Sequence, residues 1–179
     1  DDARQGDDAR QGDDARQGDD ARQGDDAQQG DGGGGAVPPG FRRYEDDTYR
    51  VAVPAGWTVS RNRNRTHFRD PGSRRFLLIE EGTSPGGDPV ADWQSQEGPV
   101  SQRLRGYQRI RISPLTFRGY DAADWEFTWQ PRTGQYHVID RAIVTERRPY
   151  AIYWSVPEGQ WEESLPTFQA IANSFEPRG

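Results

Sequence analysis

The sequence predicts an α+β domain: a mostly antiparallel β-sheet of about six to eight strands, flanked by two or more helices and preceded by a disordered tail. Two observations lead to this prediction. From residue 41 onward, short runs rich in β-branched and aromatic residues are separated by turn residues, as in a sheet built from hairpins. Two other stretches, 88–97 and 161–175, repeat apolar residues at helical spacing, so their apolar faces should pack on the sheet.

The first forty residues have the composition of a disordered linker. Residues 1–30 hold five near-copies of Asp-Asp-Ala-Arg-Gln-Gly, in which Ala is the only apolar side chain. Such a segment cannot bury enough apolar surface to offset about 1–2 kcal/mol of backbone entropy per ordered residue. With the Gly- and Pro-rich residues 31–40 included, the coil would span roughly 30–35 Å. We therefore expect a linker over 1–40 and one globular domain over 41–179.

Charge and composition limit the classes of function. Residues 1–40 carry eleven Asp and four Arg, whereas residues 41–179 carry eighteen acids and nineteen Arg and are nearly neutral. The domain therefore lacks the positive surplus that nucleic-acid binding requires. The absence of Cys excludes disulfides and thiol catalysis. An Arg-only basic set with abundant Gly, Pro and Ala is typical of a GC-rich genome such as that of an actinomycete. No apolar run reaches the 18 or so residues of a membrane span, so any anchor should lie upstream of this chain.

The first half of the domain should form a run of strands and then a short helix. Pro54-Ala55-Gly56 marks a corner between two strands, and Asp70-Pro71-Gly72-Ser73 marks the turn of a hairpin. Asp88 is a suitable N-cap with Pro89 at the first helical position, and Gly98-Pro99 should end this helix at about residue 97. The expected strands are 41–44, 49–53, 57–59, 66–69 and 75–80.

The second half repeats this order of strands followed by a helix. Turns are expected at Ser113-Pro114, Pro131–Gly134 and Arg147–Pro149. The strands between them are 107–113, 115–118 running through Gly119 into 122–129, 136–145 and 149–156. The alternation of side chains places Trp125, Phe127 and Trp129 on one face, where we expect most of them to pack in the core.

The sequence contains no convincing catalytic motif. Gly82–Gly86 matches the nucleophile elbow G-x-S-x-G, but Pro85, after the Ser, has no backbone N–H to offer an oxyanion hole. The two histidines, His67 and His137, lie too far apart to form a helical metal-binding pair, and we expect no metal and no other cofactor. The chain is therefore predicted not to be an enzyme.

The candidate binding residues are six Arg and two Trp. Arg61, Arg63 and Arg65 follow a period of two, so in an extended segment all three guanidinium groups would leave from one face and could grip phosphate or carboxylate groups. A solvated hairpin is the plainer alternative, and the acidic tail could also fold back on these cations. The complete candidate set is Arg61, Arg63, Arg65, Arg69, Arg74, Arg75, Trp125 and Trp129.

A further polar group lies within the apolar strands of the second half. Asp140-Arg141 interrupts one strand, and Asp124 and Glu126 lie in the strand before it. We expect cross-strand ion pairs here, with a polar cluster that lines a pocket as the alternative.

Several short motifs, in this order and spacing, resemble one known family. They are Tyr49-Arg50-Val51-Ala52-Val53-Pro54-Ala55-Gly56-Trp57, Phe68-Arg69-Asp70-Pro71, Asp88-Pro89-Val90-Ala91-Asp92-Trp93, Tyr120-Asp121-Ala122-Ala123-Asp124-Trp125-Glu126 and Ala172-Asn173-Ser174-Phe175. The domain looks like the extracellular C-terminal module of actinobacterial membrane Ser/Thr protein kinases and of related secreted or lipid-anchored proteins. It is also similar to the broader Mog1/PsbP-like fold, an antiparallel sheet sandwiched by helices.

The resemblance implies a placement and a class of function. In the family, a kinase domain lies inside the cell, and a membrane span and a linker connect it to this module outside. We therefore expect a non-enzymatic extracytoplasmic module, tethered to the membrane or secreted, that senses or binds an envelope ligand or a protein partner. The alternative is a secreted or lipid-anchored structural or assembly protein that acts through protein contacts. The resemblance implies no catalytic residues for this chain.

Overall fold

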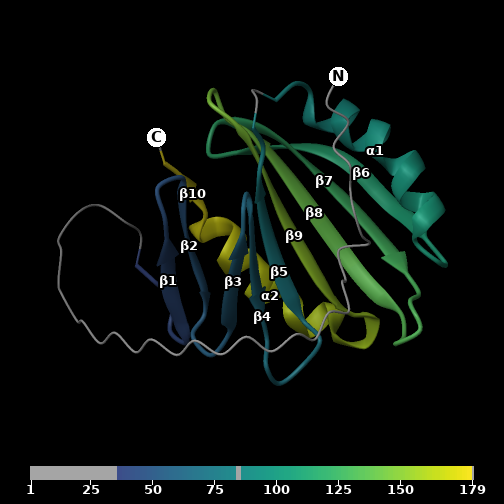
Figure 1. Cartoon of the computed structure of the whole chain (residues 1–179), viewed down its shortest axis with the longest axis horizontal. Coiled ribbons are helices and arrows are strands. Elements are labelled where there is room, and N and C mark those ends of the chain that lie inside the picture. Colours follow the sequence, from purple (N-terminus) through teal and green to yellow (C-terminus); the bar gives the residue numbers. More distant parts are fainter. Residues whose placement is uncertain (1–35, 84–85, 179) are drawn as a thin grey trace. The chain divides into compact units, whose positions relative to one another are not determined.

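The structure is a computed structural model that describes residues 36–83 and 86–178. Within them, residues from Val37 onward form one unit. This unit contains ten strands, two α-helices and a short 3-10 helix (Figure 1). In chain order the elements are β1 (Phe41–Glu45), β2 (Tyr49–Pro54), β3 (Thr58–Asn62), β4 (Arg65–Arg69), β5 (Phe76–Glu81), α1 (Pro89–Arg103), β6 (Gln108–Phe117), β7 (Tyr120–Trp129), β8 (Tyr136–Val144), β9 (Pro149–Pro157), η1 (Glu158–Gln160), α2 (Trp161–Ser174) and β10 (Glu176–Pro177).

The strands form two antiparallel sheets. The small sheet has the order β1-β2-β10, and the large sheet has the order β3-β4-β5-β9-β8-β7-β6. Every neighbouring pair in the large sheet is antiparallel, and hairpins join all of these pairs except β5 and β9. The predicted α+β class and antiparallel sheet are therefore confirmed, and the larger sheet has seven strands.

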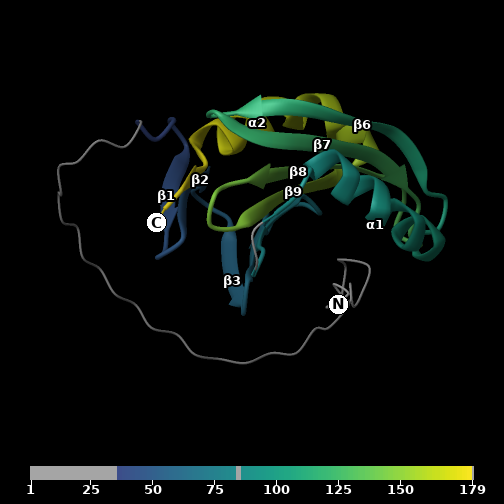
Figure 2. The same cartoon turned by 90° about the horizontal axis from the view of Figure 1, so that it is seen from above.

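The two helices cover opposite faces of the large sheet (Figure 2). Helix α2 packs against β9 and β2, so the small sheet lies on the same side as α2. Helix α1 packs against β6, β7 and β8 on the other side. The two faces of the large sheet therefore have different neighbours. We call the face that packs on helix α2 and the small sheet the α2 face, and the face that packs on helix α1 the α1 face.

The main core lies between the α2 face, helix α2 and the small sheet. Trp154 of β9 is fully buried there. Its ring stacks on Trp57, with centroids 5.6 Å apart and planes 4° apart, and lies 6.2 Å from the ring of Phe168 in α2. Tyr49 and Phe175, also fully buried, connect the small sheet to this cluster. Large aromatic side chains thus provide most of the apolar contact area in a core that has few aliphatic residues.

Helix α1 begins as predicted but ends later. The Asp88 carboxylate accepts hydrogen bonds from the backbone N–H of Val90 at 2.9 Å and of Ala91 at 3.4 Å. The predicted end at Gly98-Pro99 is wrong, because the helix continues to Arg103. Both Gly98 and Pro99 face solvent, where the ring has room and water can satisfy the backbone carbonyl that loses its partner. The buried side chains at 93 and 104 hold the helix on the sheet on both sides of Pro99.

One predicted turn, and one strand predicted to run through Gly119, are also wrong. Ser113-Pro114 lies inside β6 and makes no turn. β6 is an edge strand, and a Pro is tolerated there because an outward-facing N–H has no partner in the sheet. The turn instead falls at Arg118-Gly119, between β6 and β7, where both residues have positive φ, 50° and 84°. This is the geometry of a two-residue hairpin loop.

Candidate functional site

The six candidate Arg do not share a face. Arg63 and Asn64 form the loop between β3 and β4, and Arg63 has a φ of 54°. This turn breaks the period of two on which the prediction relied. Arg61 pairs in register with Thr66 and lies on the α2 face, whereas Arg65 pairs with Glu80 and lies on the α1 face. The prediction that Arg61, Arg63 and Arg65 point the same way is therefore wrong.

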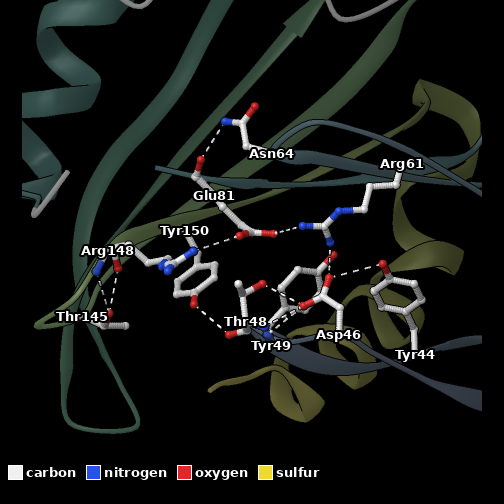
Figure 3. A network of polar contacts seen from close by, with 10 residues as sticks. All are labelled: Tyr44, Asp46, Thr48, Tyr49, Arg61, Asn64, Glu81, Thr145, Arg148 and Tyr150. Atoms are coloured by element: carbon white, nitrogen blue, oxygen red, sulfur yellow. Dashed lines mark hydrogen bonds and ion pairs between the residues drawn. The ribbon is translucent and has the colours of Figure 1, made fainter. Parts of the chain in front are cut away.

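Arg61 connects two carboxylates in a polar network at one end of the α2 face (Figure 3). Its guanidinium forms ion pairs with Asp46, in the β1–β2 turn, and with Glu81, at the end of β5, the latter at 2.9 Å. A second Arg, Arg148 from the β8–β9 turn, lies 3.3 Å from the other oxygen of Glu81. Glu81 is only 4 % exposed, so its charge depends on these two cations. The network ties the small sheet to the large one.

The surroundings of Asp46 keep this carboxylate ionised. Burial alone would raise the pKa of Asp46, but the Thr48 hydroxyl, the N–H groups of Thr48 and Tyr49 and the charge of Arg61 together lower it below 3.8. Thr48 donates from its hydroxyl at 2.7 Å and from its N–H at 2.8 Å. Burial raises the pKa of the Tyr150 hydroxyl, which donates to the Thr48 carbonyl at 2.8 Å. A carboxylate with a lowered pKa is a poor general base, so this network is suited to holding the two sheets together.

The other five Arg of the candidate set fall into two groups. Arg65 forms an ion pair with Glu80 at 3.4 Å, and Arg75 forms one with Glu163 of α2. By contrast, among the residues that the structure describes, Arg63, Arg69 and Arg74 have no carboxylate within ion-pair distance. All three are exposed. These are the cations that could bind an external anion without first losing an internal partner.

Arg69 belongs to a row of side chains that crosses the α1 face. The register pairs Arg69 with Phe76, Phe76 with Ser155, Ser155 with Val138 and Val138 with Phe127. Residues directly opposite one another in neighbouring strands point to the same side of a sheet. These five side chains therefore form one row over β4, β5, β9, β8 and β7. The guanidinium carbon of Arg69 lies 5.2 Å from the centre of the Phe76 ring.

The two candidate Trp lie beside this row on the same face. The Trp125 indole donates to the Tyr107 hydroxyl at 3.0 Å, and its ring lies 5.5 Å from Trp93 of α1. Trp125 is therefore a core residue under α1, as the packing alternative predicted. Trp129 is 6 % exposed, and its indole N–H has no partner among the described residues.

Ser155, which the sequence analysis did not single out, adds a second buried polar group to this face. It is 1 % exposed, and its hydroxyl has no hydrogen-bond partner in the part of the chain that the structure describes. Buried polar groups without a partner are rare in folded proteins and call for an explanation. No local signal could have marked it, because a Ser between Trp154 and Val156 looks like any small residue of a buried strand.

Arg74 reaches the same end of the α1 face from another direction. It lies in the β4–β5 turn and donates to the Thr133 carbonyl of the β7–β8 turn at 2.9 Å. Trp129 and Tyr136 are the last register pair before that turn, and their rings lie 6.1 Å apart. The α1 face thus combines buried aromatic side chains, two exposed Arg without carboxylate partners, and two buried polar atoms, Trp129 Nε1 and Ser155 Oγ, without partners among the described residues.

The remaining polar residues of the prediction are engaged within the fold. Arg141 binds both oxygens of Asp124 at 2.7 Å and 2.9 Å, and Arg111 binds Glu126 at 2.6 Å, so the predicted cross-strand ion pairing is confirmed. The His137 ring stacks on Trp161, with centroids 3.6 Å apart. Its two nitrogens lie 2.8 Å from Glu126 and 3.1 Å from Glu158.

Three other features complete the site description. Within residues 36–83 and 86–178, no group of three or more His, Asp or Glu side chains is placed to hold a metal ion. No helix of the described segments combines the length and apolarity needed to cross a membrane. The Ser of the G-x-S-x-G motif, Ser84, and the acidic tail that could contact the Arg cluster both lie outside the described residues.

Comparison with protein families gives one match over most of the chain. The model of the family described as "Serine/threonine kinase C-terminal domain" matches residues 42–177. This description concerns the C-terminal domain of such kinases and not their catalytic domain. A search of curated proteins found no significant match.

Solved structures share the fold at low sequence identity. Cyanobacterial PsbP (CyanoP) of Synechocystis matches at 18 % identity and a TM-score of 0.62, covering 82 % of this chain and 97 % of its own. LpqN of Mycobacterium tuberculosis, involved in cell envelope biogenesis, matches at 13 % identity and 0.57, covering 78 % and 91 %. A putative regulator of unknown function from Pseudomonas aeruginosa, PA94, matches at 16 % identity and 0.56, covering 78 % and 98 %. The predicted PsbP-like fold is confirmed.

Proposed function

Because the chain belongs to the serine/threonine kinase C-terminal domain family, we propose that it is the non-catalytic, ligand-binding module of a receptor-type serine/threonine protein kinase. In this proposal the module lies outside the cytoplasm, where residues 1–40 link it to an upstream anchor. The fold shared with LpqN, a protein involved in cell envelope biogenesis, supports this placement. The ligand would be an envelope component or a protein partner.

The observation that carries the proposal is the unsatisfied polar chemistry of the α1 face. The Trp129 indole N–H and the Ser155 hydroxyl are buried without partners among the described residues, on a face lined by Phe76, Phe127 and Tyr136. A fold gains no stability from such atoms, whereas a bound ligand could satisfy both. On the α2 side the ion pairs join Arg61 to Asp46 and Glu81, and two buried hydroxyls, those of Tyr49 and Thr66, likewise have no hydrogen-bond partner among the described residues.

An NMR titration of the full chain tests this function. Small molecules extracted from the cell envelope of the organism that encodes the chain are added to ¹⁵N-labelled protein. The proposal expects the chemical-shift changes to cluster on residues of the α1 face, such as Ser155 and Trp129. Changes confined to α2 and the small sheet, or no changes at all, would contradict it.

A second function, contact with a protein partner in a structural or assembly role, is favoured by the edge strand β6. Ile110 is 49 % exposed, and it lies where the register between β6 and β7 shifts. An exposed Ile on a strand edge is suited to a protein contact. An Ile110→Glu variant should abolish such a contact and leave ligand binding at the α1 face unchanged. If a partner co-purifies equally with the wild type and the variant, the β6 edge is not the contact site.

A further inference from the structure

We propose that strand β3 binds an extended acidic segment of a protein partner, which would add an eighth strand to the seven-stranded sheet. This inference goes beyond the proposed function, because it concerns the free edge of the sheet and not a ligand on its α1 face. Three features of β3 support it: an open edge, backbone groups that point outward, and the charge of the β3–β4 hairpin.

Strand β3 is the unprotected edge of the large sheet. It pairs only with β4, all five of its residues are exposed, and it projects from the rest of the sheet in Figure 2. The opposite edge strand, β6, contains Pro114 and a register shift between Arg109 and Arg111, and both features oppose pairing with a further strand. β3 has neither a Pro nor a register shift, so its edge is open to strand addition.

Two residues of β3 direct their backbone groups away from the sheet. The Glu81 N–H donates to the Asn64 carbonyl at 2.9 Å, so the even-numbered residues of β4 bond to β5 and the odd-numbered ones bond to β3. The register pairs these odd-numbered residues with even-numbered residues of β3. The N–H and C=O groups of Val59 and Arg61 therefore point outward, where no described strand lies beside them. An added strand would form its hydrogen bonds with these groups.

The charge of the β3–β4 hairpin favours an acidic partner. Residues 58–69 contain four Arg and no Asp or Glu. Arg61 and Arg65 have carboxylate partners within the fold, whereas Arg63 and Arg69 are exposed and have none among the described residues. Arg63 lies in the loop at one end of β3, and Arg69 lies in register with the first residue of β3. An acidic segment along this edge would thus meet an available guanidinium group near each end.

The two sides of β3 favour a partner in which acidic and apolar residues alternate. On the α1 side, β3 presents the short side chains of Thr58, Ser60 and Asn62, over which the longer side chain of Arg69 can reach the partner. On the α2 side lies Val59, which is 36 % exposed. The carboxylates of the partner would then lie on the α1 side, and its apolar residues would lie beside Val59.

A second copy of the chain is a less suitable occupant of this edge. Two β3 strands paired with each other would bring two hairpins, each with four Arg and no acidic residue, side by side. Like charges on neighbouring strands are destabilising, whereas an acidic segment would be attracted to the same hairpin. The charge of the hairpin therefore favours the acidic partner.

Three blocked peptides of about six residues separate the features of this contact. In the first peptide Glu alternates with Val. In the second Lys replaces Glu, and in the third Pro replaces Val, which keeps the charge but prevents regular strand pairing. Each peptide is titrated into the ¹⁵N-labelled full chain. Only the first should shift the amide signals of β3, and it should slow the hydrogen exchange of the Val59 and Arg61 amides.

Changes in the protein test the same contact from the other side. Val59→Pro removes an outward N–H and should weaken binding of the first peptide at least about fivefold, whereas Val59→Thr keeps the N–H and should bind like the wild type. Arg63→Gln/Arg69→Gln should weaken binding at least about threefold at low salt. The matched control, Arg105→Gln/Arg132→Gln, removes two exposed Arg from the α1–β6 loop and the β7–β8 turn and should have no effect.

Several results would overturn the inference. If the first peptide leaves the β3 amides unshifted, β3 is not a binding edge. If the Lys peptide binds equally well, or if the two double variants behave alike, the partner is not acidic. If the Pro peptide binds equally well, or if Val59→Pro binds the first peptide like the wild type, the contact is not strand addition.

A further control excludes self-association and unfolding as explanations. If sedimentation shows a dimer that Val59→Pro dissociates, the occupant of the edge is a second copy and the inference is wrong. Urea denaturation verifies that each variant is folded under the assay conditions, and the Pro peptide tests strand addition without altering the protein. None of these results bears on the α1 face, whose own titration tests the proposed function.

Discussion

Replacing Ser155 by Ala should make the protein more stable. The Ser155 side chain is 1 % exposed, and its hydroxyl has no partner in the described part of the chain. A buried hydroxyl without a hydrogen bond costs about 1–3 kcal/mol, because it loses its water partners on folding. Removing one oxygen atom creates little empty volume, for which a few tenths of a kcal/mol are lost. We therefore expect the free energy of unfolding to rise by about 1 kcal/mol.

A matched control is available in helix α2. Ser164 is 0 % exposed, but its hydroxyl donates to the Trp161 carbonyl at 2.8 Å and accepts from the Trp154 indole at 3.4 Å. The same change, Ser164→Ala, leaves the Trp154 N–H without a partner and should lower stability by about 1–2 kcal/mol. Urea unfolding measures both variants, provided that the slope against urea concentration stays at the wild-type value.

The two variants should thus move in opposite directions. If Ser155→Ala lowers stability as much as Ser164→Ala does, the Ser155 hydroxyl is satisfied within the fold. The main structural argument for a ligand on the α1 face would then be lost. If the stability of Ser155→Ala rises while its binding of the envelope extract in the NMR titration weakens, the hydroxyl serves binding at the expense of stability.

Three further predictions concern the ion-pair network and two prolines. Glu81→Gln should lower the free energy of unfolding in urea by about 1.5–3 kcal/mol, because a buried carboxylate between two cations is lost. Glu45→Gln, at an exposed ion pair, should change it by about 0.5 kcal/mol or less. Equal effects of the two changes would contradict a stabilising role of the network. The pKa of Asp46 is lowered, so its carboxylate stabilises the fold above pH 3.8 and this contribution is lost as pH falls through the folded pKa. The stability gap between wild type and Asp46→Asn should therefore shrink between about pH 5 and pH 2, and a constant gap in urea titrations would refute this assignment. Pro99→Ala should raise the stability of the protein by about 1–3 kcal/mol in thermal melts, because Pro99 lies inside helix α1. Pro114→Ala, on the edge strand β6, should have little effect. Equal effects of the two changes would mean that the helix is interrupted at residue 99.

Much of the fold could be predicted from the sequence because its strands alternate regularly. The register confirms that Trp125, Phe127 and Trp129 share a face, and the predicted turn Asp70–Ser73 lies between β4 and β5 as expected. Two predictions made from Gly or Pro residues failed, the helix end at Gly98-Pro99 and the turn at Ser113-Pro114. In both places the surrounding structure tolerates the missing N–H, because the residue is exposed or lies at an edge. Local breakers are therefore weaker evidence than the pattern of the whole segment.

The candidate site was harder to predict because it depends on register between distant strands. The Arg63-Asn64 loop has no Gly to mark it, so residues 60–65 were assigned to no strand, and a shared face for Arg61 and Arg65 depended on this segment being extended. The row from Arg69 to Phe127 pairs Phe76 directly with Ser155, 79 residues later in the sequence, and no local pattern contains it. Arg69, Arg74 and Trp129 were nevertheless among the candidates, because Arg can bind anions through fork-like hydrogen bonds and Trp was considered as a ligand contact as well as a core residue.

The most direct test of the ligand-binding α1 face is the NMR spectrum of the six Trp indole N–H groups during titration with anilinonaphthalene sulfonate. The indoles of Trp93 and Trp125 already have acceptors at 3.0 Å, and that of Trp154 is bonded within the α2-side core. Only Trp129 should shift strongly, and its shift should saturate together with the dye fluorescence. A large shift of Trp154 with none at Trp129 would place the ligand elsewhere and contradict the account.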